Sequence, residues 1–152
     1  MTPQPARPAD FPAIVRLLQD AALPHGDLTP EHLRHFLVLR DGDELAGVVG
    51  MEVADDAGLL RSLAVPEARR GGGLAMRLVD ALEERARASG IRTLYLLTTT
   101  AEGFFARRGY ARADRAAVPD AIAATPEFRG ICPASAACMA RALAPAEQPA
   151  VV

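Results

Sequence analysis

The order of elements around one glycine run constrains the fold of this chain more than any other feature. The apolar stretch 59–65 predicts a buried strand, and the triple glycine 71–73 follows it after two arginines. Apolar residues at helical spacing predict a helix over 72–89, and the apolar run 91–97 predicts a second buried strand. A strand–helix–strand unit pairs its strands in parallel through a right-handed crossover. The segment therefore predicts a parallel strand pair with the glycines at the start of the connecting helix.

The flanking patterns add antiparallel strands and short helices to this unit. Asp10 and Thr29 are typical helix N-caps and predict two helices before the first strand. An Asp-Gly turn at 41–44 predicts a hairpin between strands over 36–40 and 45–53. The elements expected further on are a short helix at 101–108, one or two helical turns at 118–125, a loop at 126–136 and a last strand at 137–143.

Composition narrows the class of partner. The net charge of −2 argues against sequence-independent nucleic-acid binding, which needs clustered positive charge. No apolar run reaches the roughly 18 residues of a membrane span, and the N-terminus is amphipathic rather than signal-like, so we expect a cytoplasmic protein. With 152 residues, we expect a single domain over 1–144 and a disordered tail over 145–152.

The glycine run is typical of a phosphate-binding loop, and three known loop patterns can be compared with it. The chain has no lysine, which excludes the P-loop pattern. The dinucleotide pattern needs glycine where Met76 stands and an acidic residue after the second strand, where there is none. The pattern R/Q-x-x-G-x-G/A is matched by Arg70, Gly73 and Ala75. Bare N–H groups at a helix start would bind a diphosphate there, unless the glycines form only a flexible turn and the arginines a solvated face.

This third pattern is the acetyl-CoA signature of the GNAT family of N-acetyltransferases, which the chain resembles. "LAVPEARRGGGLAMRL" resembles the family's strand–loop–helix segment, and "FFARRGY" resembles a later segment. The resemblance implies an α/β (α+β) fold with a mixed, mostly antiparallel sheet, a splayed parallel strand pair and flanking helices. Members are often dimers, so a homodimer is one expectation.

The resemblance also implies acetyl-CoA as co-substrate, with no metal. Leu63, Ala64 and Val65 are then expected to bind pantetheine, with the Val65 N–H stabilising the oxyanion. The residues expected to bind the rest of the cofactor are Arg70, Gly71, Gly72, Gly73, Leu74, Ala75 and Phe105.

The chain departs from the family pattern at two catalytic positions. Phe105 stands where many members carry a tyrosine acid, and Leu59 stands where many carry a glutamate base. Glu52 is the candidate base or amine-binding group, and its alternative is an exposed strand-end residue. Tyr95 and Tyr110 are interpreted as packing residues.

The acceptor is expected to be a small primary amine. Arg61 is a candidate for binding an acceptor carboxylate, and its alternative is pairing with Asp55 or Asp56. Thr98 is a second candidate acceptor-binding residue. "LYLLTTTAEGFFARRGY" resembles N-acetylglutamate synthase domains. Together with "GLLRSLAV" and "CPASAACM", it resembles an arsenic-resistance subgroup, which implies a glutamate-like acceptor or its arsenic or phosphorus analogue.

Two alternative functions, and the roles of the cysteines and histidines, also have to be considered. The rivals are a non-catalytic acetyl-CoA sensor and a protein N-acetyltransferase. Cys132 and Cys138 lack a third thiol, so small-residue packing is favoured over a metal or arsenic site. His25, His32 and His35 show no metal-ligand spacing to a carboxylate cluster and are interpreted as surface or packing residues. We therefore predict an enzyme with a small-molecule acceptor.

Overall fold

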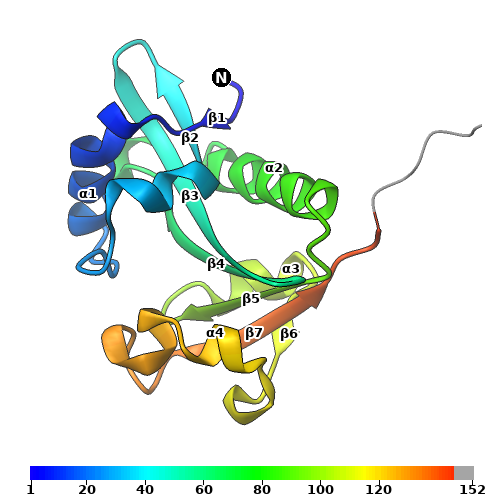
Figure 1. The fold of residues 1–152 in the computed structure, drawn as a ribbon. Helices are drawn as coiled ribbons and strands as arrows, with labels where there is room; N and C mark the ends of the chain where they lie inside the picture. The colour runs from blue at the N-terminus through cyan, green and yellow to red at the C-terminus, as the bar shows by residue number, and fades with distance from the viewer. Residues whose placement is uncertain (146–152) are drawn as a thin grey trace, which may run out of the picture.

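The computed structural model describes residues 1–145, which form a seven-stranded sheet flanked by helices (Figure 1). The order of the strands in the sheet is β1-β2-β3-β4-β5-β7-β6. Only the β4–β5 pair is parallel, and the other pairs are antiparallel. The strands are β1 (Gln4–Pro5), β2 (Phe36–Asp41), β3 (Glu44–Ala54), β4 (Ala57–Ala64), β5 (Thr93–Thr98), β6 (Ala111–Arg112) and β7 (Ala137–Ala142).

The helices cover both faces of the sheet, and Figure 1 shows α1 and α2 on opposite sides of it. One face packs against α2 and α3 through a core that includes Leu78, Leu82 and Phe105. The other face packs against α1 and η2 over its first half, and against α4 over its second half. The helical segments are η1 (Pro8–Asp10), α1 (Phe11–Asp20), η2 (Pro30–His35), η3 (Glu67–Arg69), α2 (Leu74–Ala88), α3 (Glu102–Arg107), η4 (Arg115–Ala117), α4 (Asp120–Ala123) and η5 (Glu127–Ile131).

The parallel pair is splayed, as predicted. Strands β4 and β5 are paired only at Ala57–Thr93, Gly58–Leu94 and Leu59–Tyr95. Beyond Leu59, β4 stays bonded to β3 but no longer to β5. Its register against β3 shifts after Arg61, where Ser62 adopts a left-handed φ of 59°. A bulge of this kind bends a strand away from its neighbour, and the two strands therefore diverge.

Two local predictions are wrong. Asp10 does not cap α1: it accepts the Arg7 N–H at 2.7 Å and forms a two-bond ion pair with Arg40. Burial beside a guanidinium favours that pair over a cap. The stretch expected to be a loop contains a short helical segment, η5, which is kinked at Gly130, whose φ of 141° is not helical. The predicted disordered tail lies, apart from residue 145, outside the described residues.

Candidate functional site

The glycine loop between β4 and α2 has an open backbone. Gly71 and Gly73 take left-handed φ angles of 88° and 80°, which favour glycine. Gly72 does not take a left-handed φ, and a Cβ added to it would meet only the Arg69 carbonyl oxygen, at 3.8 Å. Neither backbone conformation nor packing within the chain requires glycine at position 72. Room for a ligand against the loop is the remaining reason.

Helix α2 begins directly after this loop without a side-chain cap, which leaves its first N–H groups for another acceptor. A 15-residue helix also carries partial positive charge at this end. Anionic groups, phosphates above all, bind at such helix ends. The residues present therefore fit the diphosphate of coenzyme A.

The two arginines before the glycines differ in their partners. Arg69 is paired with Asp41 at 2.9 Å and lies 3.6 Å from Glu44, both in the β2–β3 hairpin. Arg70 is exposed, and its Nε donates to the Val65 carbonyl oxygen at 3.0 Å. The positive charge of Arg69 is thus offset by carboxylates. Arg70, the residue predicted to bind the cofactor, keeps an exposed guanidinium beside the loop.

A pocket of about 110 Å³ lies where β4 and β5 separate. Leu63 from β4, Thr98 from β5 and Phe105 from α3 line it together with Arg61, so the fold brings these four predicted residues to one site. A larger pocket of about 600 Å³ adjoins it. The two pockets share Leu23, Pro24, Leu97, Thr98, Thr100 and Cys132.

Val65 and Ala64 lie at the end of the divergent strand. Ala64 is the last β4 residue paired with β3, opposite Val48. Val65 follows it, outside the β3–β4 pairing, and its side chain packs in the core with Leu78. Val65 is therefore the first residue beyond the paired part of β4.

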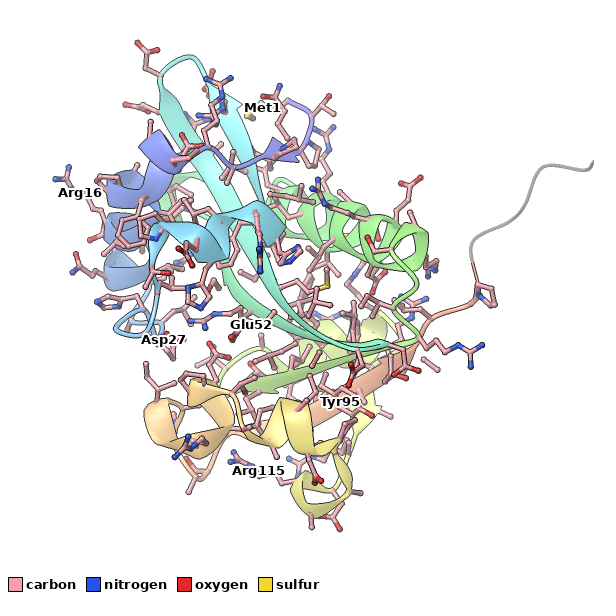
Figure 2. The ribbon with its side chains drawn as sticks, viewed as in Figure 1. Met1, Arg16, Asp27, Glu52, Tyr95 and Arg115 are labelled. Carbon is pink, nitrogen blue, oxygen red and sulfur yellow. The ribbon has the colours of Figure 1, made fainter. Side chains whose placement is uncertain are left out.

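Arg61 is the centre of a buried ion cluster, which we call the carboxylate cluster and define as Arg61, Asp27, Glu52 and Glu127. The Arg61 side chain is fully buried and donates two bonds to Asp27, at 2.6 and 2.9 Å. It donates one bond to Glu52 at 3.0 Å, and its Nη2 lies 3.4 Å from Glu127. Figure 2 shows Asp27 and Glu52 in the region between the N-terminal helices and the segment that carries α4.

These contacts correct the alternative considered for Arg61. Its partners are the three carboxylates of the cluster rather than Asp55 or Asp56, which are exposed in the β3–β4 turn. Three carboxylates around one guanidinium carry an excess of negative charge. An acceptor amine, which is a cation in water, is attracted to such a site.

Burial and charge shift the pKa values within the cluster in different directions. Burial alone would raise the pKa of Asp27, but its hydrogen bonds to Arg61 and the positive charge of Arg61 together outweigh burial and lower it. Burial raises the pKa of Glu127 to about 7. The positive charge of Arg61 offsets this effect only in part, and the negative charges of Asp27 and Glu52 add to it. The pKa of Arg61 is raised, since its carboxylate partners outweigh its burial. The guanidinium is thus permanently charged, whereas Glu127 exchanges its proton near neutral pH.

The prediction that no histidine has metal-ligand spacing to a carboxylate cluster is wrong for His32. Ligand atoms of His32, Asp27 and Glu52 lie within 4.8 Å of one another. However, the Arg61 guanidinium already donates hydrogen bonds to both carboxylates, at 2.6 and 3.0 Å, so these carboxylates are already engaged as hydrogen-bond acceptors. We therefore assign no metal to this group.

The tyrosines and cysteines lie where packing explains them. The Tyr110 hydroxyl donates to buried Glu83 at 2.8 Å, and burial with that carboxylate raises the pKa of Tyr110. Tyr95 packs against the cluster around Leu59. Cys132 and Cys138 are free and buried, and burial raises the pKa of both thiols. A protonated thiol is a poor metal ligand.

Asp27 and Glu127 are site residues that the sequence did not predict. Asp27 lies in the connection after α1 and Glu127 in η5, each more than 30 positions from Arg61. Arg61 itself is the signal that could have found them. A guanidinium in an apolar strand requires a buried carboxylate partner, although the sequence does not say which one.

An open helix N-terminus lies beside two diverging parallel strands, an arrangement typical of proteins that bind a phosphate-bearing ligand. The model of the acetyltransferase (GNAT) family matches residues 5–113, more than half of the chain. The chain belongs to this family, and its fold is the acyl-CoA N-acyltransferase fold.

Curated relatives of this chain are named as amino-acid acetyltransferases. An amino-acid acetyltransferase of Pseudomonas fluorescens (strain Pf0-1) is 41% identical over 75 residues, 49% of this chain and 17% of that relative. An amino-acid acetyltransferase of Pseudomonas syringae pv. tomato is 36% identical over 103 residues, 67% of this chain and 24% of that relative. The chain thus spans about a quarter or less of the length of these relatives.

Solved structures agree with the fold. N-acetylglutamate synthase of Neisseria gonorrhoeae, complexed with coenzyme A and L-arginine, superposes with a TM-score of 0.80 at 25% identity, over 93% of this chain and 33% of that one. A Mycobacterium tuberculosis protein in complex with CoA and NLQ gives a TM-score of 0.80 at 24% identity, over 95% and 100%. Within residues 1–145, no helix combines the length and the apolar character needed to cross a membrane.

Proposed function

We propose that the protein transfers the acetyl group of acetyl-CoA to the primary amine of an amino acid or a similar small molecule. The observation that carries the proposal is that three features lie next to one another at the end of β4. The open loop at Gly71–Gly73, the unpaired end of β4 and the pocket beside Leu63 follow one another in that order. A diphosphate at the loop would direct the acyl end of the cofactor into the split.

The Val65 N–H is the proposed donor for the oxyanion that forms when the amine attacks the thioester. It belongs to the first residue past the last β3–β4 pair. A single donor of this kind typically contributes about 3 kcal/mol to transition-state stabilisation. Because the group belongs to the backbone, side-chain substitutions leave it in place.

No tyrosine is available at this site to protonate the leaving thiolate. Phe105 is buried against Phe104 and Tyr110 in edge-to-face contacts and has no proton to donate. The Tyr110 hydroxyl is bound to Glu83. We propose that the thiolate takes its proton from water or from the amine that has just been acylated.

An amino-acid acceptor is supported by the size and the charges of the paired pockets. A volume of about 600 Å³ lies within the range of small-molecule sites. The ammonium group would face the carboxylate cluster, and Thr98 lines both pockets. Arg61 binds Asp27 through two bonds, so an acceptor carboxylate would reach it only by replacing Asp27. A glutamate-like acid, or its arsenic or phosphorus analogue, is the acceptor class we propose to test first.

The test is thiol release from acetyl-CoA with a panel of amines. The panel contains glutamate, glutamine, a phosphinic analogue of glutamate, an arsenic analogue and a lysine-containing peptide. We expect release with at least one free amino acid or analogue and none with the peptide. Coenzyme A binding without release for any amine would contradict the proposal and favour a sensor, and release with the peptide alone would favour a protein acetyltransferase.

A further inference from the structure

Glu127 is a buried carboxylate with incomplete charge compensation. Its side chain is only 5% exposed, and the ion-pair partner recorded for it is Arg61, at 3.4 Å. That guanidinium already gives two short bonds to Asp27 and one to Glu52. Of the three carboxylates, Glu127 therefore has the weakest ion pair with the single guanidinium of the cluster. A buried carboxylate in this situation gains stability by taking up a proton.

Glu127 is also the one carboxylate of the cluster that lines the pocket between β4 and β5. It shares that wall with Leu63, Thr98 and Phe105, the residues that frame the expected path of the acyl group. Glu52 is not among the residues that line this pocket. The carboxylate with the least compensation is thus the one in reach of a molecule bound there.

The groups that face Glu127 come from four parts of the chain. They are Arg61 on β4, Asp27 in the connection after α1, Glu52 on β3 and Cys132 just after η5. The Cys132 thiol faces Glu127, and burial together with this carboxylate raises the pKa of the thiol to about 12. The thiol therefore stays protonated and does not compete for a proton near neutral pH.

Two further charged groups lie in the next layer. His32 Nε2 is 3.9 Å from Glu52, and the positive charge of Arg115 acts on Cys132. Each acts on a neighbour of Glu127 rather than on Glu127 itself.

We propose that Glu127 is the catalytic residue that accepts a proton from the acceptor ammonium group, an inference that rests on the proposed function. The excess negative charge of the cluster first attracts the acceptor as a cation. The ammonium then gives one proton to the Glu127 carboxylate and becomes a neutral amine. The amine nitrogen bonds to the acetyl carbon, the carbon–sulfur bond breaks, and the second amine proton ends on the thiolate. Glu127 afterwards returns its proton to water.

The pKa of Glu127 suits this exchange. A base works best when its pKa lies near the working pH, and burial brings this carboxyl to about 7. The ionised form is the one that accepts the proton. The rate should therefore rise with pH through about 7 and level off above it.

The kinetic test compares Glu127→Gln with wild-type enzyme over pH 5.5–9. We expect kcat/KM for the acceptor to fall at least about a hundredfold at pH 7 and the rise near pH 7 to vanish, with KM for acetyl-CoA unchanged. Glu84→Gln, an exposed carboxylate on α2, is the matched control and should keep the wild-type profile. A Glu127→Gln profile like that of wild type would overturn the proposal. Loss of the rise in Glu52→Gln instead would also overturn it.

A second measurement needs no acceptor. In protein labelled with ¹³C at the glutamate carboxyl carbons, the resonance that is missing from Glu127→Gln should titrate in wild type near pH 7. A midpoint near the ordinary glutamate value of about 4.3 would overturn the proposal even if the enzyme is active. If wild type releases no thiol with any amine, the proposed function fails and the role of Glu127 fails with it. If wild type is active and Glu127→Gln equally so, only the role of Glu127 fails.

Discussion

The glycine loop and the carboxylate cluster build the two halves of the site in different ways. The loop is a continuous stretch of main chain at 71–73, where a Cβ would meet nothing within 4 Å at Gly71 or Gly73 and one backbone oxygen, at 3.8 Å, at Gly72. The cluster is made of side chains from four separate segments, around the fully buried Arg61. A backbone site should tolerate the loss of side chains but not added bulk. A cluster of buried charges should instead be sensitive to any change in charge balance.

The largest effect is expected from removing the positive charge of the cluster. Arg61→Met leaves three carboxylates without their shared partner, and breaking a buried ion pair in this way costs about 3–5 kcal/mol of unfolding free energy. The measurement is urea unfolding at pH 7. The double variant Arg61→Met/Asp27→Asn should regain part of the loss, because it removes one of the stranded charges. A loss below about 1 kcal/mol would mean that the cluster is solvated rather than buried.

The next effect concerns the glycine loop. Gly72→Glu adds bulk and negative charge at a position where neither the backbone conformation nor the packing requires glycine, so the protein should stay folded. The Kd for coenzyme A should rise at least a hundredfold, or about 2.7 kcal/mol. Isothermal titration calorimetry measures it.

The matched control for the loop variant is Ala88→Glu. It adds the same charge to an exposed position at the opposite end of α2. Coenzyme A affinity should change little there. Equal affinity of Gly72→Glu and Ala88→Glu would remove the glycine loop from the binding site.

A smaller effect is expected from Tyr110, which lies in neither region. Tyr110→Phe removes the hydroxyl bound to Glu83, while Arg141 still binds that carboxylate at 2.9 Å. The expected loss of stability is about 1–2 kcal/mol, with kcat unchanged. Thermal unfolding and the rate of thiol release test the two parts. A large fall in kcat with unchanged stability would instead identify Tyr110 as the missing acid.

The smallest effect comes from an ion pair with balanced charges, Asp10–Arg40. The Arg40 guanidinium lowers the pKa of Asp10, so the pair stabilises the fold above the ordinary aspartate value of about 3.9. This stability is lost as the pH falls through the lowered pKa of the folded state. Asp10→Asn should cost about 1 kcal/mol at pH 7 and nothing below pH 2. Urea unfolding at both pH values measures it, and an equal cost at both would contradict the ion-pair interpretation.

Glu127 should show the opposite sign. Its folded pKa is raised above the unfolded value, so the folded state holds more protons between about pH 4.3 and 7 and loses stability as the pH rises through that window. Glu127→Gln should remove this slope. The Asp10–Arg40 pair and the carboxylate cluster would then differ in the direction in which each changes the free energy of unfolding as the pH rises.

The loop and the fold were predictable because their signals are local. The helix after Gly73, the hairpin at Gly42 and the strand that carries Arg61 each follow from a few neighbouring residues. The splay of the parallel pair was predicted by resemblance, and it is confirmed by β4–β5 pairing that stops at Leu59.

The carboxylate cluster was predictable only in part, because its partners are distant in sequence. Arg61 and Glu52 were singled out, since a charge in an apolar strand needs a partner. Asp27 and Glu127 lie in irregular connections, and only the packing of α1 and η5 against the sheet brings them to Arg61. No local pattern marks them.

The binding of coenzyme A at the glycine loop can be tested by following the backbone amide resonances of ¹⁵N-labelled protein during titration with coenzyme A. We expect the largest chemical-shift changes on residues 71–76 and 63–65, the open loop and the unpaired end of β4. Changes confined to other surfaces, with those amides unmoved, would contradict it.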